Sequence, residues 1–138
     1  MQALDRVALN PPGAPKPLGA YSHAVKVKPG TLVYIAGQVG VDANGVLLGK
    51  GDVGAQTRQV FQNIGHILSG VGASFGNVVE FTTYLVGREA IQPFIEARTQ
   101  LFPTLFPNGD YPPNTLLIID GLVHEDMLVE IKAVAVLP

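Results

Sequence analysis

The best candidate for acid–base chemistry is a glutamate in the last apolar stretch of the chain. Residues 128–136 alternate between two faces, and Glu130 shares one face with Lys132 and Val134, while the other face is entirely apolar. A strand carboxylate that is partly removed from solvent could accept a proton from water as a general base. The structural alternative is an ion pair between Glu130 and Lys132 or another basic group, because strand carboxylates are usually solvated or paired.

Other reactive residue types give weaker signals. The sequence has no cysteine, which excludes disulfides and thiolate nucleophiles. The three histidines, His23, His66 and His124, share no short metal-ligand spacing. There is no glycine-rich loop followed by Lys-Ser/Thr and no ordered Ser/His/Asp pattern. The sequence therefore predicts neither a metal nor an organic cofactor.

The composition favours one small domain that works in the cytoplasm. A chain of 138 residues fits a single domain over 1–138, and its 14% of charged residues is low against the roughly 25% of typical soluble domains. The net charge is −2 and no basic run is present, which argues against a nucleic acid partner. No apolar stretch approaches the roughly 20 residues of a membrane span, and the N-terminus does not resemble a signal peptide.

The first third of the chain predicts an arm followed by short strands. Residues 10–19 contain four prolines and two glycines, so we expect 1–19 to form an irregular arm and order to begin near Ala20. Residues 21–27 and 31–36, separated by Pro-Gly, favour an antiparallel pair. An Asn-Gly turn then precedes a possible short return strand over 46–48.

The remaining residues alternate between helical and strand periodicity. Apolar residues at three- and four-residue spacing predict a helix from Asp52 to about Ala73, and Gly72 is placed to stop it. A second helix is predicted from Ile91 to Phe102 or Phe106. Strands are expected at 78–86, 115–119 and 128–136. The first of them predicts a half-buried strand with alternating faces: one face carries Val79, Phe81, Thr83 and Leu85, and the other carries Glu80, Thr82 and Tyr84.

This order, β-β-(β)-α-β-α-β-β, predicts an α+β protein with two helices on one face of a mixed sheet. Two helices cannot cover both faces of so apolar a sheet. Neighbouring subunits are therefore expected to cover the rest, and the low charge content agrees with that expectation.

Five segments together resemble the RidA/YjgF family: 17–24 (PLGAYSHA), 35–39 (IAGQV), 55–64 (AQTRQVFQNI), 112–115 (PPNT) and 128–135 (LVEIKAVA). The resemblance implies a chorismate-mutase-like fold and a homotrimer with three ligand clefts at the subunit interfaces. It also implies hydrolysis of small imines or enamines to a ketone and ammonia, without metal or organic cofactor.

Several residues match the family's cleft. Glu130 matches a glutamate that helps to position or activate water, and Tyr21 matches a tyrosine whose hydroxyl can donate to the ligand. Gly37 matches a glycine that lets the ligand approach the backbone, and Thr115 could add a hydroxyl or a backbone N–H. Tyr21 could instead be a half-buried residue at a subunit contact, and Gly37 and Thr115 could be ordinary strand residues.

Three positions depart from the family pattern. Asn114 stands where an arginine clamps the substrate carboxylate in the deaminases, so the usual 2-imino acid substrates are in doubt. Ala36 replaces a small hydroxyl residue and Ile95 replaces an asparagine, which predicts a more apolar pocket. Asn114 could equally be a strand-entry residue after Pro-Pro. Arg88 or Arg98 could restore the missing charge, although such arginines are usually solvated.

Two functions therefore remain open. The first is hydrolytic deamination of an enamine or imine that differs from the usual 2-imino acids. The second is a non-catalytic small-molecule-binding or regulatory module that keeps the cleft. An RNA-cleaving activity is disfavoured, because the chain is acidic and lacks interleaved basic and aromatic residues.

Overall fold

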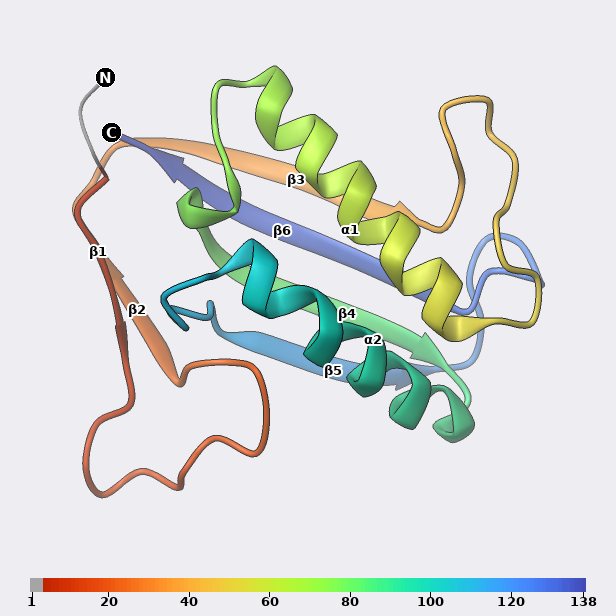
Figure 1. The fold of residues 1–138 in the computed structure, drawn as a ribbon, viewed down its shortest axis with the longest axis horizontal. Coiled ribbons are helices and arrows are strands. Elements are labelled where there is room, and N and C mark those ends of the chain that lie inside the picture. Colours follow the sequence, from red (N-terminus) through yellow and green to blue (C-terminus); the bar gives the residue numbers. More distant parts are fainter. Residues whose placement is uncertain (1–3) are drawn as a thin grey trace.

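The computed structural model describes residues 4–138 (Figure 1). Its elements, in chain order, are β1 (Arg6–Leu9), β2 (Ala24–Val27), β3 (Thr31–Val39), α1 (Val53–Gly70), the 3-10 turn η1 (Phe75–Asn77), β4 (Val78–Val86), the 3-10 turn η2 (Arg88–Ala90), α2 (Ile91–Leu105), β5 (Asn114–Ile119) and β6 (Val129–Leu137). Within these residues, no helix is both long and apolar enough to cross a bilayer.

The main sheet has four strands in the order β3-β6-β4-β5. β6 pairs antiparallel with β3 and with β4, whereas β4 and β5 are parallel and are joined through α2, as a parallel connection requires. Both helices lie on the same face of this sheet (Figure 1). This arrangement confirms the predicted α+β class and the two helices on one face.

The long helix α1 follows the predicted periodicity. It begins after Asp52, whose carboxylate accepts a hydrogen bond from the Ala55 N–H at 3.0 Å, as an N-cap should. Its apolar stripe is buried against the sheet and includes Val60, Phe61, Ile64 and Leu68. The helix ends at Gly70, about three residues before the predicted end.

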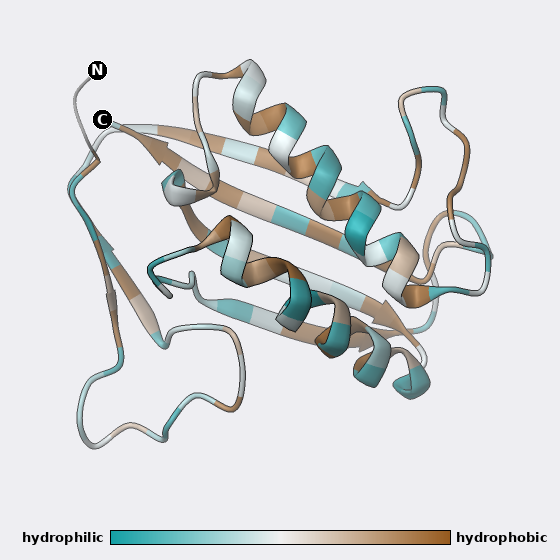
Figure 2. Cartoon of the chain, in the orientation of Figure 1, coloured by the Kyte–Doolittle hydropathy of each residue, from teal (hydrophilic) through white to brown (hydrophobic). Residues whose placement is uncertain are grey.

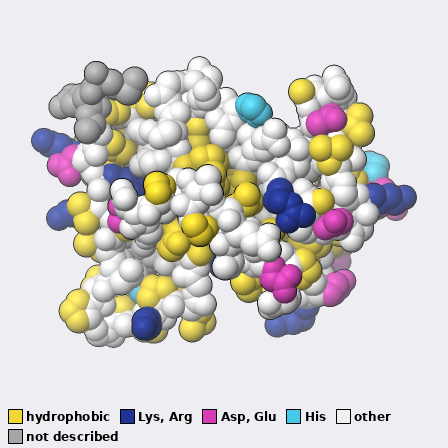
Figure 3. Space-filling view, viewed as in Figure 1, with side chains coloured by type: hydrophobic (Ala, Val, Ile, Leu, Met, Phe, Trp, Pro, Cys, Tyr) yellow, Lys and Arg dark blue, Asp and Glu magenta, His cyan; other side chains and the backbone are white. Residues whose placement is uncertain are grey.

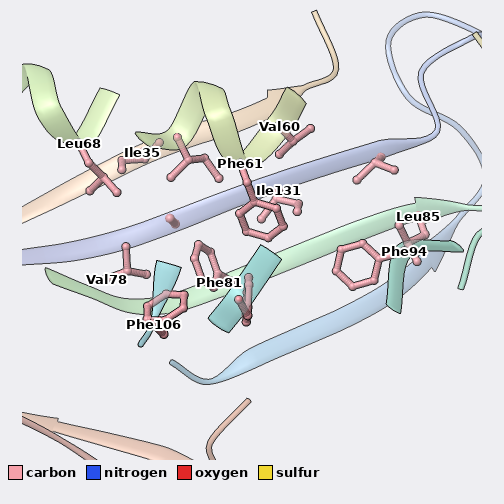
Figure 4. Close-up of a cluster of buried hydrophobic side chains, with 14 of the residues drawn as sticks. Ile35, Val60, Phe61, Leu68, Val78, Phe81, Leu85, Phe94, Phe106 and Ile131 are labelled. Atoms are coloured by element: carbon pink, nitrogen blue, oxygen red, sulfur yellow. The ribbon is translucent and has the colours of Figure 1, made fainter. Parts of the chain in front are cut away.

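Hydrophobic residues recur along both the helices and the strands (Figure 2), and the core between them is strongly aromatic (Figure 4). Phe61 on α1 lies edge-on to Phe81 on β4, with ring centroids 5.6 Å apart, and to Phe102 on α2, at 5.3 Å. Phe106 extends the cluster at the end of α2, 5.1 Å from Phe102. Edge-to-face pairs of this kind contribute about 0.5–1.5 kcal/mol each beyond their burial, so this cluster fixes α1 and α2 over the sheet.

The N-terminal prediction was partly wrong. Residues 10–19 are irregular as expected, but order begins at Arg6 rather than near Ala20, and β2 pairs with β1 instead of with β3. Residues 1–3 of the predicted arm lie outside the described part of the chain. Gly30 permits the observed pairing of β3 with β6, because a Cβ atom there would overlap the Leu137 carbonyl oxygen. From Thr31, β3 pairs with β6 as far as Val39.

Two smaller predictions also need correction. Residues 46–48 form only an isolated bridge between Val41 and Leu47, after the predicted turn at Gly45. In β4 the pairing with β6 shifts between Val78 and Glu80, so Val78 enters the core instead of Val79. From Phe81 onward the predicted alternation holds.

Arg6 fastens the β1–β2 hairpin to the rest of the fold. Its Nε donates to the Val78 carbonyl and its Nη2 to the Asp110 carbonyl, both at 3.0 Å. Burial lowers the pKa of Arg6, and the Asp110 charge partly opposes that shift.

We predict that Arg6→Ala lowers the free energy of unfolding by about 1–3 kcal/mol, because two charge-assisted hydrogen bonds are lost. Urea unfolding measures this, with the exposed Lys26→Ala on β2 as the control. Equal effects of the two substitutions would show that Arg6 does not hold the hairpin.

Candidate functional site

Glu130 lies on the face of the sheet that the helices leave uncovered. On β6, its neighbours Val129 and Ile131 are fully buried under the helices, whereas Glu130 is half-buried and Lys132 is exposed on the opposite side. The same face displays Tyr34 of β3, which is 75% exposed. The predicted orientation of Glu130 is thus confirmed.

The Glu130 carboxylate lies directly against the backbone of Gly37. Between Ile35 and Gln38 the pairing of β3 with β6 shifts by one residue, which is a β-bulge. A Cβ atom on Gly37 would lie 2.4 Å from Oε2 and 2.7 Å from Cδ of Glu130, so a larger residue cannot occupy this position without moving the carboxylate. The bulge is closed by the Gln38 side chain, whose Nε2 donates to the Ala36 carbonyl at 3.1 Å.

Other candidate residues share this uncovered face. Strand register places Tyr84 and then Leu117 beside Glu130, and places Thr115 across Thr82 from Lys132. Thr115 and Ala36 are both exposed. The structure therefore gathers Glu130, Gly37, Ala36 and Thr115 on one face.

The predicted alternative of an ion pair at Glu130 is not observed in the described chain. Among residues 4–138, the observed ion pair joins Lys50 Nζ and Asp126 Oδ2 at 3.8 Å, and it does not involve Glu130. Lys132 is two residues from Glu130 on the same face and does not bind it. In a single copy of the chain, the carboxylate is thus left without a basic partner.

Asn114 and Ile95 belong to the helix-covered side of the sheet. Asn114 pairs with Phe81, a core residue, and its Oδ1 accepts a hydrogen bond from the buried Thr83 hydroxyl at 2.8 Å. Ile95 on α2 packs against the core. One copy of the chain therefore does not bring either residue to Glu130, and the hydrogen bond to Thr83 supports the structural alternative for Asn114.

Tyr21 lies in the loop that joins β1 to β2. Its hydroxyl accepts a hydrogen bond from the Leu18 N–H at 3.1 Å, and its ring stands edge-on to the His23 ring. His23 is itself fixed, because its backbone N–H donates to Asn10 Oδ1 at 2.9 Å and its imidazole Nε2 contacts the Pro15 carbonyl oxygen. These contacts hold the proline-rich loop in a defined shape with Tyr21 at its end.

Arg98 is the residue whose environment the sequence predicted least well. It was expected to be solvated, yet only 6% of it is exposed. The loop between β1 and β2 covers it, and a Cβ atom on Gly19 would lie 3.0 Å from its Nη2. Burial lowers the pKa of Arg98, and Tyr21 partly opposes that shift. The available signal was its position on the apolar stripe of α2, one turn from Phe94 and one from Phe102. Arg88, the other candidate, is exposed.

A groove of about 840 Å³ lies elsewhere, between the polar face of α1 and the loop after β3. Its walls include Gln59, Asn63 and His66, and none of the predicted cleft residues lines it. The Asn63 side chain donates to the Val39 and Val41 carbonyls there, at 3.1 and 2.9 Å. These polar groups fasten the loop to the helix.

We predict that Gly37→Ala destabilises the protein by about 1–3 kcal/mol, because the new methyl group overlaps the Glu130 carboxylate. In a Glu130→Ala background the same substitution should cost much less, since the overlapping atoms are gone. Urea unfolding of the four proteins tests this coupling. Gly121→Ala, where no atom lies within 4 Å, is the control, and additive effects at Gly37 and Glu130 would contradict the contact.

Comparison with known proteins identifies relatives over most of the chain. A family model described as endoribonuclease L-PSP matches residues 12–137. A 3-aminoacrylate deaminase, RutC, from Acinetobacter baylyi is 36% identical over 125 residues, covering 91% of this chain and 93% of that protein. A human 2-iminobutanoate/2-iminopropanoate deaminase is 35% identical over 107 residues, covering 78% and 77%.

The fold has close structural relatives too. The crystal structure of a Rid-family protein of unknown function from Yersinia pestis superposes with a TM-score of 0.86 at 32% identity, covering 96% of this chain and 99% of that one. The match of the family model and the identity to these relatives agree with the motifs read from the sequence. The chain therefore belongs to the RidA/YjgF family, the family that this model describes.

Proposed function

We propose that this protein hydrolyses an enamine or imine metabolite to a carbonyl compound and ammonia, in the cytoplasm and without metal or organic cofactor. The observation that carries the proposal is the Glu130 carboxylate, which lies unpaired on the uncovered face against the Gly37 backbone. Relatives at 35–36% identity named as 3-aminoacrylate and 2-iminobutanoate/2-iminopropanoate deaminases support the reaction class.

Glu130 would act on the water molecule. As water adds to the carbon of the protonated C=N bond, the carboxylate accepts one of the water protons and the C=N electron pair moves onto nitrogen, which gives a neutral carbinolamine. Glu130 then returns this proton to the amine nitrogen, the C–N bond breaks with loss of ammonia, and the hydroxyl oxygen forms the C=O bond as its proton passes to solvent water. An enamine enters the same route after protonation at carbon. The narrow space over Gly37 keeps the carboxylate in place for both proton transfers.

We place this reaction in a cleft between copies of the chain, in a homotrimer. Within one copy, Glu130 and Thr115 lie on the uncovered face, whereas Tyr21 and Asn114 do not. The uncovered face also exposes Leu32, Tyr34 and Leu117, which are 54%, 75% and 44% accessible. A neighbouring copy packed there would bury this apolar surface and could bring its own Tyr21 to Glu130.

The substrate should differ from the 2-imino acids that are held by an arginine at position 114. Asn114 carries no charge, and its carbonyl oxygen is already bound to the Thr83 hydroxyl. An amide cannot replace the paired, charged donors of a guanidinium. Ala36, on the uncovered face, lacks the hydroxyl of the 2-imino acid deaminases, so the proposed cleft is more apolar there.

The alternative is a binding module that keeps the cleft without turnover, which the departures at Ala36, Ile95 and Asn114 favour. RNA cleavage has less support, although the family model is described as an endoribonuclease. The net charge is −2, and charged side chains are scattered over the helix-covered face without a continuous basic patch (Figure 3). Backbone phosphates need such a patch.

We predict that the protein releases ammonia from freshly generated enamines or imines, and that Glu130→Gln lowers the rate at least about a hundredfold, as loss of a general base does. Ammonia release in a coupled assay measures this. Glu80→Gln is a matched control, because Glu80 is an exposed carboxylate on β4 beside Val134.

The binding module would behave differently. Neither the unmodified protein nor Glu130→Gln would release ammonia above the control, yet both would bind the carbonyl product with similar affinity. Calorimetry with that product separates the two functions. Equal losses in Glu130→Gln and Glu80→Gln would contradict a specific role for Glu130.

A further inference from the structure

Arg98 is a buried cation that has no anionic partner in the described chain. It is 94% removed from solvent, given its 6% exposure, and its Nε is buried without a hydrogen-bond acceptor. No carboxylate among residues 4–138 lies within ion-pair distance of its guanidinium. A guanidinium stays protonated in proteins, so burial leaves a full charge uncompensated.

The immediate surroundings compensate this charge only in part. The guanidinium lies over the Phe94 ring, 5.2 Å from its centroid, which provides a weak cation–π attraction. The backbone of Gly19 closes over the group from the loop between β1 and β2. A Cβ atom on Gly19 would lie 3.0 Å from Arg98 Nη2, so the loop can close this tightly over the guanidinium only because Gly19 has no side chain.

Tyr21 supplies a second polar group at this point. Its backbone N–H donates to the Gly19 carbonyl at 2.9 Å, and Gly19 itself lies against Arg98 Nη2. The Tyr21 hydroxyl oxygen accepts a hydrogen bond from the Leu18 N–H, and this bond leaves the hydroxyl proton available for donation. A cation and a hydroxyl donor thus adjoin where the loop meets α2.

We propose that Arg98, with Tyr21 beside it, binds the carboxylate of a small ligand. A guanidinium pairs with a carboxylate through two parallel hydrogen bonds, which would satisfy the buried Nε and neutralise the charge. Because the Gly19 backbone lies against Nη2, the loop would shift to admit the anion, and a small ligand requires a smaller shift than the side chain of a neighbouring subunit. The ligand class, a carboxylate-bearing enamine or imine, rests on the proposed function.

This site also refines the substrate. The charge comes from α2 instead of from the start of β5, where Asn114 now binds Thr83. We infer that the substrate keeps a carboxylate, which is held from α2 instead of from β5, and a small 2-oxo acid probes this group.

The test uses binding, so that it does not depend on turnover. Thermal unfolding and calorimetry at constant ionic strength are carried out with 2-oxobutanoate and with its uncharged amide. The unmodified protein should gain thermal stability from 2-oxobutanoate, Arg98→Met should bind it at least about tenfold more weakly, and the amide should not distinguish the two proteins. The exposed Arg88→Met is the matched control and should bind as the unmodified protein does.

Ligand-free stability gives an independent readout. If Arg98 is unpaired, Arg98→Met should melt at or above the temperature of the unmodified protein, because an uncompensated buried charge has been removed. A lower melting temperature together with no response of the unmodified protein to 2-oxobutanoate would overturn the proposal and show that the assembly itself pairs Arg98. If Arg98→Met does not fold, Arg98→Lys replaces it and should bind 2-oxobutanoate more weakly, since the paired donors are lost.

The outcomes for this site and for the deaminase are separable. Binding that depends on Arg98, without ammonia release from any imine, would support the anion site and contradict the proposed enzyme. Ammonia release that Arg98→Met leaves unchanged, with unchanged binding of 2-oxobutanoate, would contradict the anion site alone.

Discussion

The structure depends on the covering of a four-stranded sheet by two helices on one face only. Successive residues of a strand point to opposite faces, so the burial of Val129 and Ile131 under the helices forces Glu130 onto the uncovered face. The bulge in β3 then adds one residue opposite β6 and brings the Gly37 backbone under the carboxylate. The alternation of side chains along β6 that buries the core residues therefore also fixes the position of the Glu130 carboxylate.

The candidate cleft residues fall into two groups within one copy of the chain. Glu130, Gly37 and Thr115 lie on the uncovered face, while Tyr21 and Arg98 both adjoin Gly19, where the loop after β1 packs on α2. A second copy on the uncovered face would bury exposed apolar surface and could join the two groups. The proposed assembly and the proposed chemistry are therefore two consequences of one arrangement.

The elements with regular periodicity could be predicted from the sequence. The apolar stripe of α1 and the alternation of β6 are local patterns, and both helices and the face of Glu130 were predicted from them. Contacts between distant segments could not be predicted in this way. The pairing of β1 with β2 across a proline-rich loop, the approach of Gly30 to Leu137 and the burial of Arg98 all depend on tertiary packing. The family resemblance supplied Gly37, but only the structure shows which side chain its missing Cβ accommodates.

We propose that the site is completed between subunits, and this can be tested by complementation between two inactive variants. Glu130→Gln and Arg98→Met are co-expressed, so that mixed oligomers form, and ammonia release is compared with that of each variant alone. If one subunit supplies Glu130 and its neighbour supplies Arg98, about a quarter of the sites in a random mixture contain both native residues, and activity should return to about that fraction. Mixed oligomers that are no more active than either variant alone would contradict a shared site.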